Sequence, residues 1–385
     1  MTRRLEALLD EGVATGVFPC ARAVVWHRGA PVLEGGAGGA TARTIFDLAS
    51  VTKVMCTTAA FLSLWAEGKV EPDASVSRYV PDAAAGRARI TVDDLLYHRS
   101  GLPTFVPFFA PVMREGPRLF DRDCPAALRA AARRVVVERV LATAPTEPPR
   151  TGAAYSDVGF LLLGELLSVA AGAPLDALFT ERVAGPLGLS ARFRRLSTTP
   201  ARDSDLARIA ATGSIRPREP APGQEGLWAP LGTHASPPGE VDDDNAWVMD
   251  GVAGHAGLFG TASDVALFGQ AVLEEAAGAG RIAPSRLWEH ALRRDVATPG
   301  STRALGFDTI LPGDPRGTSA GSHIGEAPPG AVGHVGFTGV SLWIDRARHL
   351  VVAFCTNRTA AGRAETRIRE FRPRFHDAVL ENLDL

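Results

Sequence analysis

The sequence has few of the residues that mark several common protein classes. Its four cysteines, at positions 20, 56, 124 and 355, lie far apart and form no CxxC pair. Neither a disulfide framework nor a zinc site is therefore predicted. No stretch approaches the roughly 20 uninterrupted apolar residues of a membrane span. The net charge is only −2, which argues against nucleic acid or an anionic membrane as the main partner.

The first residues also lack the pattern of a signal peptide. Acidic residues stand where such a peptide would have its apolar region. Residues 3–15 are instead predicted to form an amphipathic helix. We therefore expect a cytoplasmic protein.

Lysine is almost absent. Lys53 and Lys69 are the only lysines among 41 basic residues. Arginine keeps its charge under nearly all conditions, whereas a lysine can lose its proton when it is desolvated. A lysine in so arginine-rich a sequence is therefore a candidate for a position that needs a compact ammonium or a transferable proton.

Strand patterns lie at both ends of the sequence, and helical patterns lie between them. Strand-like runs cover 21–27, 31–34, 340–344 and 350–355. Helical patterns cover 50–65, 91–97, 125–142, 157–171, 174–184, 262–276, 284–294 and 363–382, with long loops at 101–124 and 198–250. The order predicts an α/β (α+β) protein in which residues 1–66 and 297–385 form one sheet domain. A mainly helical domain, 67–296, is inserted into it.

Ser50 and Lys53 open one of these helices. Their i,i+3 spacing places both side chains on one face, so the amine can reach the hydroxyl. A serine hydroxyl is a poor nucleophile until a neighbour takes its proton, and a lysine or a lysine–tyrosine pair can do so. The pair alone is also compatible with a helix-capping serine beside a solvated lysine.

Four segments in a fixed order strengthen the catalytic interpretation. They are Phe46–Lys53, Leu95–Pro103, Tyr155–Gly159 and Gly333–Gly339. Together they resemble the penicillin-binding-protein and class C β-lactamase superfamily, which includes related carboxylesterases. The resemblance implies a three-layer sandwich, an antiparallel sheet flanked by helices, with the helical domain beside it and the active site between the two. The run 244–258 also resembles a segment of many such hydrolases.

The resemblance assigns catalytic roles to single residues. It implies that Ser50 is the acylated nucleophile, Lys53 its activator and Tyr155 the general base that later protonates the leaving group. We expect the Lys53 ammonium to lower the pKa of the tyrosine, because a nearby cation favours the phenolate. The backbone N–H groups of Ser50 and Phe337 would form the oxyanion hole. No metal and no organic cofactor are expected.

Three further residues are expected to bind substrate, and two of them depart from the family pattern. His334 and Gly336 match the strand that lines the other side of the site, but His334 stands where the family often has lysine. A fixed positive charge for a penicillin carboxylate is then absent or partial at neutral pH. Asp157 replaces the usual asparagine, and an ionised aspartate cannot donate a hydrogen bond to a substrate carbonyl. Both departures favour a less anionic ester.

Several other polar residues have simpler explanations. His98 and Ser100 are predicted to stabilise the turn after a helix, and His255 to have a structural role beneath the site. The acidic run 242–244 is predicted to be a loop and not a metal site. The segment 317–321 is a literal GxSxG, but its Gly/Pro-rich surroundings lack the strand and helix of a nucleophile elbow.

These observations predict a serine hydrolase that forms an acyl-enzyme on Ser50 and acts on a small ester, in the manner of a carboxylesterase. One alternative is a β-lactamase or a D-amino-acid peptidase. Another is a binding protein that keeps the fold without turnover. The expected partner is a small ester or amide, with no nucleic acid and no membrane. The sequence predicts neither the natural substrate nor the oligomeric state.

Overall fold

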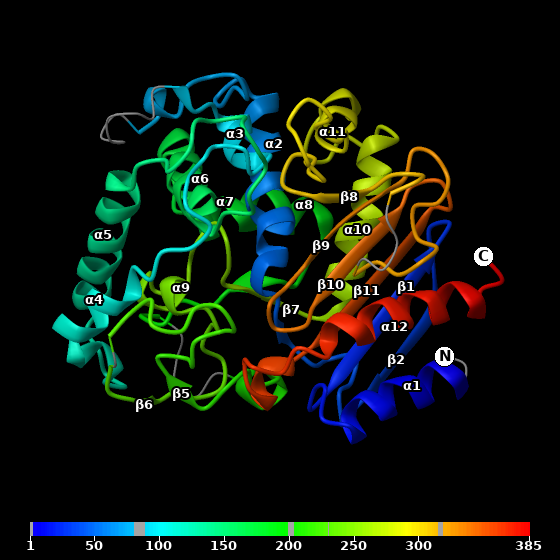
Figure 1. The fold of residues 1–385 in the computed structure, drawn as a ribbon, viewed down its shortest axis with the longest axis horizontal. Coiled ribbons are helices and arrows are strands. Elements are labelled where there is room, and N and C mark those ends of the chain that lie inside the picture. Colours follow the sequence, from blue (N-terminus) through cyan, green and yellow to red (C-terminus); the bar gives the residue numbers. More distant parts are fainter. Residues whose placement is uncertain (1–2, 81–88, 199–203, 230, 315–318) are drawn as a thin grey trace.

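A six-stranded antiparallel sheet forms the centre of the computed structural model, which describes residues 3–80, 89–198, 204–229, 231–314 and 319–385. The strand order is β2-β1-β11-β10-β9-β8 (Figure 1). The strands are β1 (Ala21–His27), β2 (Ala30–Ala37), β8 (Asp308–Ile310), β9 (Ala331–Val335), β10 (Ser341–Asp345) and β11 (Leu350–Thr356). Because β1 pairs with β11, strands from the two ends of the chain lie next to each other in the middle of the sheet.

Both predicted hairpins are present. β1 pairs with β2, and β10 pairs with β11, each in antiparallel register. The two short strands β8 and β9 were not delimited from the sequence. β9 contains Gly333, whose lack of a side chain matters because a Cβ there would lie 2.2 Å from the carbonyl of Leu342. The close approach of the two backbones requires glycine here, but glycine has a low strand propensity. Sequence patterns alone therefore do not indicate this strand.

Both faces of the sheet are buried, as the alternating side chains of β11 show. Leu350, Val352 and Phe354 belong to one apolar core, which they share with helices α1 (Arg3–Ala14) and α12 (Ile368–Asn382). Val351 and Ala353 belong to the other core, which lies under α10 (Ala262–Ala276). Side chains on a strand alternate between the two faces. The predicted three-layer arrangement is therefore confirmed.

The segment that carries Ser50 is an irregular, buried helix. It begins as a 3₁₀ turn at Ala49–Val51, continues as a π-helix over Lys53–Thr58 and becomes the α-helix α2 at Ala59–Ala66. The stretch Ala49–Ala66 has the length and mean hydropathy (1.2) of a membrane span, but 83% of it is buried inside the protein. A bent pair of segments, Asp157–Ala171 and Leu175–Leu187, passes the same test only if it is counted as one span. Burial of this kind is typical of a core helix.

The remaining helices form a second part beside the sheet (Figure 1). They are α3 (Val92–Leu96), α4 (Phe109–Glu115), α5 (Ala126–Ala142), α6 (Asp157–Ala171), α7 (Leu175–Phe179), α8 (Gly185–Leu187) and α9 (Asp244–Val248). Two small sheets accompany them, formed by β3 (Phe46–Asp47), β7 (Leu258–Gly260) and β4 (Arg192–Phe193), and by β5 (Ile215–Arg216) and β6 (His234–Ala235). Helix α11 (Ser285–Ala291) instead packs against α10.

Some predicted boundaries were wrong. The expected loop 101–124 contains α4, and the expected loop 198–250 contains α9 and two short strands. Helix α12 begins at Ile368 and not at 363, and α11 ends at Ala291 and not at 294. These helices are short or begin without a side-chain cap, so the usual start and stop signals are missing.

The division into a sheet domain (1–66 and 297–385) and a helical domain (67–296) stays a prediction. Helix α10 lies inside the predicted helical range, yet it packs against β1, β10 and β11. Its apolar side chains share the core of the sheet. These contacts favour assigning 262–276 to the sheet domain.

Candidate active site

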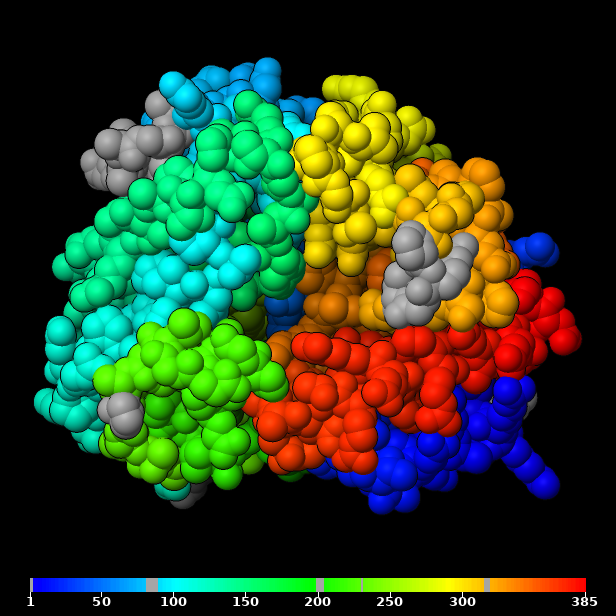
Figure 2. Space-filling model, in the orientation of Figure 1, coloured from blue at the N-terminus to red at the C-terminus, as the bar shows by residue number. Residues whose placement is uncertain are grey.

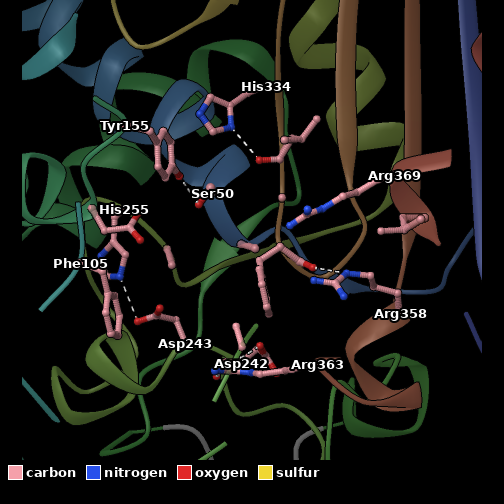
Figure 3. Close-up of a pocket in the computed structure, with 18 of the residues that line it drawn as sticks. Ser50, Phe105, Tyr155, Asp242, Asp243, His255, His334, Arg358, Arg363 and Arg369 are labelled. Atoms are coloured by element: carbon pink, nitrogen blue, oxygen red, sulfur yellow. Dashed lines mark hydrogen bonds and ion pairs between the residues drawn. The ribbon is translucent and has the colours of Figure 1, made fainter. Parts of the chain in front are cut away.

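Ser50 lies within hydrogen-bond distance of two titratable side chains, and Figure 3 shows its contact with one of them, Tyr155. Its Oγ is 2.7 Å from the Tyr155 hydroxyl and 3.0 Å from Lys53 Nζ. The preceding residue, Ala49, has a φ of 45°, which is uncommon for a residue with a side chain. The sharp turn places Ser50 at the start of its helix, and Ser50 lines a cavity.

Lys53 is completely buried and is held by three acceptors. Besides Ser50, its Nζ contacts Asp157 Oδ1 at 2.7 Å and the backbone carbonyl of His255 at 3.1 Å. Burial lowers the pKa of the ammonium, but the charge of Asp157 and the phenol of Tyr155 outweigh burial, so the pKa lies above its usual value. Lys53 is therefore protonated at neutral pH.

The pKa of Tyr155 reflects opposing effects. The Lys53 ammonium lowers the pKa of this phenol, as predicted. Burial and the negative charge of Asp157 outweigh that contribution, so the pKa of Tyr155 lies above its usual value. Tyr155 is a neutral phenol at rest, and its phenolate is a minor species.

The beginning of α6 positions Tyr155 and Asp157. The side chain of Ser156 caps the helix by accepting a hydrogen bond from the N–H of Gly159 at 3.0 Å. The N–H of Ser156 donates to Nδ1 of His98 at 3.0 Å, and the ring of His98 lies 4.8 Å from that of Tyr155. Sequence reasoning assigned His98 only to its local turn. Its contact with residues almost 60 positions away has no local signal.

The predicted oxyanion-hole residues lie on two segments. Among the residues that the structure describes, neither the N–H of Ser50 nor that of Phe337 has a hydrogen-bond acceptor. The N–H of Gly336, in contrast, donates to the carbonyl of Val340 at 2.7 Å. The hydroxyl of Thr338 donates to the backbone carbonyl of Asp47 at 2.7 Å and ties the two segments together. Two free N–H groups are what a developing oxyanion needs.

His334 is buried on β9, with its ring 5.9 Å from that of Tyr155. Its Nδ1 lies 2.8 Å from the carbonyl of Val335, so this nitrogen carries the proton and donates. Burial, together with the charges of Lys53 and Arg303, holds the pKa of the imidazole well below its usual range. His334 is therefore neutral at pH 7 and supplies no fixed positive charge.

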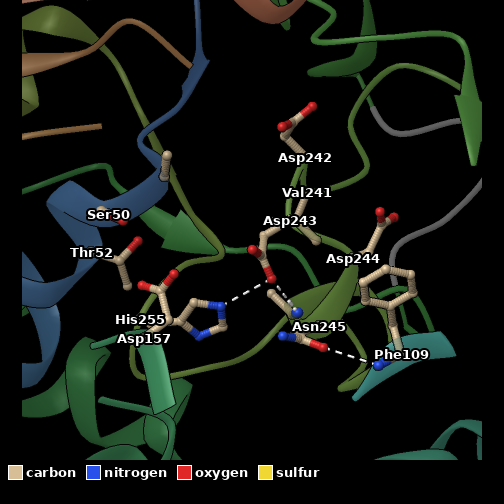
Figure 4. A network of polar contacts seen from close by, with 12 residues as sticks. Ser50, Thr52, Phe109, Asp157, Val241, Asp242, Asp243, Asp244, Asn245 and His255 are labelled. Carbon is tan, nitrogen blue, oxygen red and sulfur yellow. Dashed lines mark hydrogen bonds and ion pairs between the residues drawn. The ribbon is translucent and has the colours of Figure 1, made fainter. Parts of the chain in front are cut away.

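A polar network lies beneath the nucleophile (Figure 4). The Asp47 carboxylate is buried and accepts hydrogen bonds from the N–H groups of Ala49 at 2.8 Å and Asp242 at 2.6 Å. Burial raises the pKa of Asp47 to about 7. His255 Nε2 contacts Asp243 Oδ1 at 2.9 Å. The predicted structural role of His255 agrees with these contacts, whereas the role of Asp47 was missed.

Two carboxylates of the acidic run 242–244 pair with arginines. Asp242 pairs with Arg363 at 3.0 Å, and Asp244 pairs with Arg216 at 2.5 Å. Within the described ranges, no group of three or more histidine, cysteine and acidic side chains is arranged to hold a metal ion.

The GxSxG segment has no nucleophile-elbow geometry in its described part. Gly317 and Thr318 lie outside the described residues. Ser319 lies in a turn, and its carbonyl accepts a hydrogen bond from the ring of His376 at 2.8 Å. No helix follows Ser319 directly in the described chain, so the rejection of this motif agrees with the structure.

A cavity of about 390 Å³ opens above Ser50. Figure 2 shows the hollow between the helical part and the C-terminal segments. Ser50, Tyr155, Asp157, His334, Gly336 and Phe337 all line it, and Lys53 reaches it through Ser50. The structure therefore brings every predicted site residue together. It adds five arginines to the lining, which are Arg303, Arg358, Arg363, Arg369 and Arg372.

Known proteins are similar to this chain in sequence or in fold. A putative D-alanyl-D-alanine carboxypeptidase of Escherichia coli (strain K12) is 28% identical over 335 residues, 83% of this chain and 70% of the relative. An N-acetylmuramyl-L-alanine amidase of Bacillus subtilis (strain 168) is 28% identical over 389 residues, 92% of this chain and 80% of the relative. A hydrolase with promiscuous acyltransferase activity superposes with a TM-score of 0.67 at 20% identity, covering 96% of this chain and 98% of its own.

The family model described as Beta-lactamase matches residues 5–372, nearly the whole chain. This match agrees with the order of the motif segments that contain Ser50, Tyr155 and His334, and with the sandwich architecture. The chain therefore belongs to the Beta-lactamase family of serine hydrolases.

Proposed function

We propose that the protein hydrolyses a small carboxylic ester through an acyl-enzyme on Ser50. The observation that carries this proposal is the double contact of Ser50 Oγ, with Tyr155 at 2.7 Å and Lys53 at 3.0 Å, at the floor of a cavity. At rest both groups donate hydrogen bonds to Oγ. When Tyr155 loses its proton, its phenolate lies at the distance needed to take the proton of Ser50, and the Lys53 ammonium stabilises the charge that develops.

The first half of the reaction transfers the acyl group. Ser50 Oγ attacks the substrate carbonyl carbon while its proton passes to the phenolate form of Tyr155. The N–H groups of Ser50 and Phe337 receive the negative charge of the carbonyl oxygen. Tyr155 then gives the proton to the departing alkoxide, and an alcohol leaves.

The second half repeats these steps with water. Tyr155 takes a proton from water, the hydroxide attacks the acyl carbon, and Ser50 Oγ leaves and regains the proton. Lys53 stays protonated throughout, and its ammonium stabilises charge at Oγ. Since the phenolate is the minor form of Tyr155, the proposal requires a rate that rises with pH through the neutral range.

Hydrolysis of an amide next to a D-amino acid is the second candidate. The name of one relative, a putative D-alanyl-D-alanine carboxypeptidase, supports it, and the name of the other, an N-acetylmuramyl-L-alanine amidase, supports amide hydrolysis in general. The carboxylate of Asp157 argues against it, because it faces Lys53 and cannot donate to an amide carbonyl. An ester and an amide with the same acyl group, assayed side by side, would separate the two functions.

Two serine variants test the proposal. Ser50→Ala should abolish turnover of a 4-nitrophenyl ester, because no other nucleophile occupies that position. Ser319→Ala, in the GxSxG segment, should leave turnover nearly intact. Activity that survives Ser50→Ala and disappears with Ser319→Ala would overturn the assignment.

A further inference from the structure

Arg372 is a buried cation on α12. Phe371 and Phe375 anchor this helix in the core that it shares with the sheet, which places Arg372 behind the turn between β9 and β10. Arg372 is only 6% exposed. Among the described residues its hydrogen-bond acceptors are backbone carbonyl oxygens and not carboxylates. A buried cation without a counter-ion is costly, so these contacts need a physical explanation.

The charge of Arg372 is present at neutral pH despite this burial. Burial, together with the nearby charges of Arg358 and Arg369, lowers the pKa of its guanidinium to about 9, which is still well above 7. Its Nε is buried and has no hydrogen-bond partner in the described chain. The guanidinium therefore acts on the described protein through Nη2.

Nη2 of Arg372 joins the two ends of the turn that carries Phe337. It donates to the carbonyl of Gly336 at 2.8 Å and to the carbonyl of Val340 at 3.0 Å. The turn is also closed by the N–H of Gly336, which donates to the carbonyl of Val340 at 2.7 Å. A Cβ at Gly336 would lie 2.8 Å from the carbonyl of Leu48. The turn is therefore packed directly against the segment that leads to Ser50.

The carbonyl that Arg372 binds belongs to the same peptide unit as the N–H of Phe337. A peptide unit is planar, and resonance couples its carbonyl oxygen to its N–H. A hydrogen bond from a cation to that oxygen polarises the unit and makes the N–H a stronger donor. The N–H of Phe337 has no acceptor among the described residues. The charge of Arg372 therefore reaches the predicted oxyanion hole through a single peptide.

The second predicted donor, the N–H of Ser50, is supported differently. The carbonyl of its peptide unit belongs to Ala49 and accepts a hydrogen bond from the backbone N–H of Thr52. A neutral donor polarises a peptide less than a charged one, since charge-assisted hydrogen bonds are about twice as strong. The Phe337 side of the oxyanion hole therefore has the stronger electrostatic support.

We propose that Arg372 is a positioning residue for the oxyanion hole. It holds the Gly336–Phe337 peptide in place and strengthens the N–H of Phe337 as a donor to the oxygen that becomes negative when Ser50 attacks. This inference rests on the proposed function, because it names a residue that supports the same reaction. Arg372 also borders the cavity, so the experiment must separate an effect through the peptide from a contact with the substrate.

The division of an activity loss between kcat and KM makes this separation. Arg372→Met removes the charge and both hydrogen bonds. Removing an oxyanion-hole donor outright costs about 10²–10³-fold, so weakening one should cost about tenfold in kcat for a 4-nitrophenyl ester. KM should stay unchanged, because the interaction is made in the transition state. Arg372→Lys keeps the charge without the planar fork and should lose less. A loss confined to KM would overturn the inference.

Arg129→Met is the matched control. Arg129 lies on α5, is 7% exposed and donates to the backbone carbonyl of Leu119 at 3.1 Å. It is a similarly buried arginine outside the lining of the cavity above Ser50. Arg129→Met should leave kcat unchanged. An equal loss of kcat in Arg129→Met and Arg372→Met would show a general effect of removing a buried arginine and would overturn the inference.

A spectroscopic measurement tests the same claim without turnover. A fluorophosphonate forms a stable phosphonyl adduct on Ser50, whose phosphoryl oxygen takes the place of the oxyanion. Its ³¹P resonance responds to hydrogen bonds at that oxygen. In Arg372→Met the resonance should move from the wild-type position toward that of the denatured adduct, and in Arg129→Met it should not move. If Arg372→Met does not fold, Arg372→Lys should show a smaller shift in the same direction.

Wild-type resonance positions in both Arg372 variants would overturn the inference. Failure of the proposed function would give a different result. Ser50 would then form no adduct, or ester cleavage would survive Ser50→Ala.

Discussion

Two walls of one cavity carry positive charge in different ways. On the wall beside α6, Lys53 is completely buried and meets Asp157 at 2.7 Å, so its charge is matched. On the wall beside α12, Arg358 and Arg372 are also buried, yet among the described residues their hydrogen-bond acceptors are backbone carbonyl oxygens. An ion pair fixes the relative positions of two side chains, whereas these arginines hold the backbone of the turn at Phe337. The difference separates an ion-paired cation beside the nucleophile from basic residues that support the turn on the other side of the cavity.

The largest expected effect on activity comes from replacing Lys53, the cation that is paired with Asp157. Lys53→Arg keeps the charge but adds bulk and removes the compact ammonium that contacts Ser50. We expect a loss of at least ~100-fold in kcat/KM for a 4-nitrophenyl ester, the lower end for assistance with proton transfer. Lys69→Arg is the control, since this lysine is half-exposed and pairs with Glu67. Near-normal activity of the Lys53→Arg protein would refute the role.

Removing the negative charge of Asp157, the counter-charge of Lys53, should shift the pH dependence of kcat/KM. The carboxylate of Asp157 raises the pKa of Tyr155 and that of Lys53. In Asp157→Asn both values should fall, so the phenolate of Tyr155 forms at lower pH. The rising limb of the kcat/KM profile should therefore move toward lower pH. A limb that stays in place, or moves to higher pH, would show that Tyr155 is not the base.

The same variant should change substrate choice by a smaller factor. Asparagine restores the donor that the family usually has, and it removes a charge that repels a substrate carboxylate. The ratio of chromogenic cephalosporin hydrolysis to ester hydrolysis at pH 7 should rise several-fold, since one recovered hydrogen bond contributes about 1 kcal/mol. If the ratio stays flat or falls, Asp157 does not set this preference.

A different effect, on stability, is expected at a residue that joins the two walls. Asp47 contacts Ala49 beside the nucleophile, and its backbone carbonyl accepts from Thr338 on the opposite segment. Its pKa is about 7 in the fold against 3.8 for an ordinary aspartate. Between these values the folded state holds one more proton than the unfolded state. The contribution of Asp47 to stability therefore falls as pH rises, by about 1.4 kcal/mol per pH unit.

Denaturant unfolding of wild type and Asp47→Asn at pH 5 and pH 8 measures this contribution. The wild type should lose stability relative to the variant as the pH is raised. Asp121 is the control, because its carboxylate is exposed and pairs with Arg118. The difference in unfolding free energy between the wild type and Asp121→Asn should be the same at both pH values. If the difference between the wild type and Asp47→Asn is also the same at both pH values, the buried carboxylate does not titrate in this range.

The sequence predicted the site residues around Lys53 much better than the arginines beside α12. Ser50 and Lys53 are one helical turn apart, so their contact follows from local spacing. The contacts of Tyr155 with Ser50 and of Asp157 with Lys53 span more than 100 positions, and the family resemblance was needed to predict that these residues share one site. Strand patterns at both ends of the chain predicted a sheet built from both termini, and the resemblance added the three-layer sandwich. Local patterns misjudged the balance of charges at Tyr155, because burial and Asp157 act on the phenol together and neither magnitude can be read from spacing.

The arginines beside α12 left no local pattern. Arg358, Arg369 and Arg372 are three among many arginines, and only the docking of α12 against the turn at Phe337 brings them to the cavity. His98 was missed for the same reason, since its ring reaches Tyr155 only in the folded chain. Long-range packing of this kind has no counterpart in the spacing of residues.

The claim that Ser50 is the acylated nucleophile can be tested directly by mass spectrometry of the protein after reaction with a fluorophosphonate probe. We predict one adduct per chain, located on the peptide that contains Ser50 and absent from Ser50→Ala. An adduct on the peptide that contains Ser319, or no adduct on the wild type, would contradict the account.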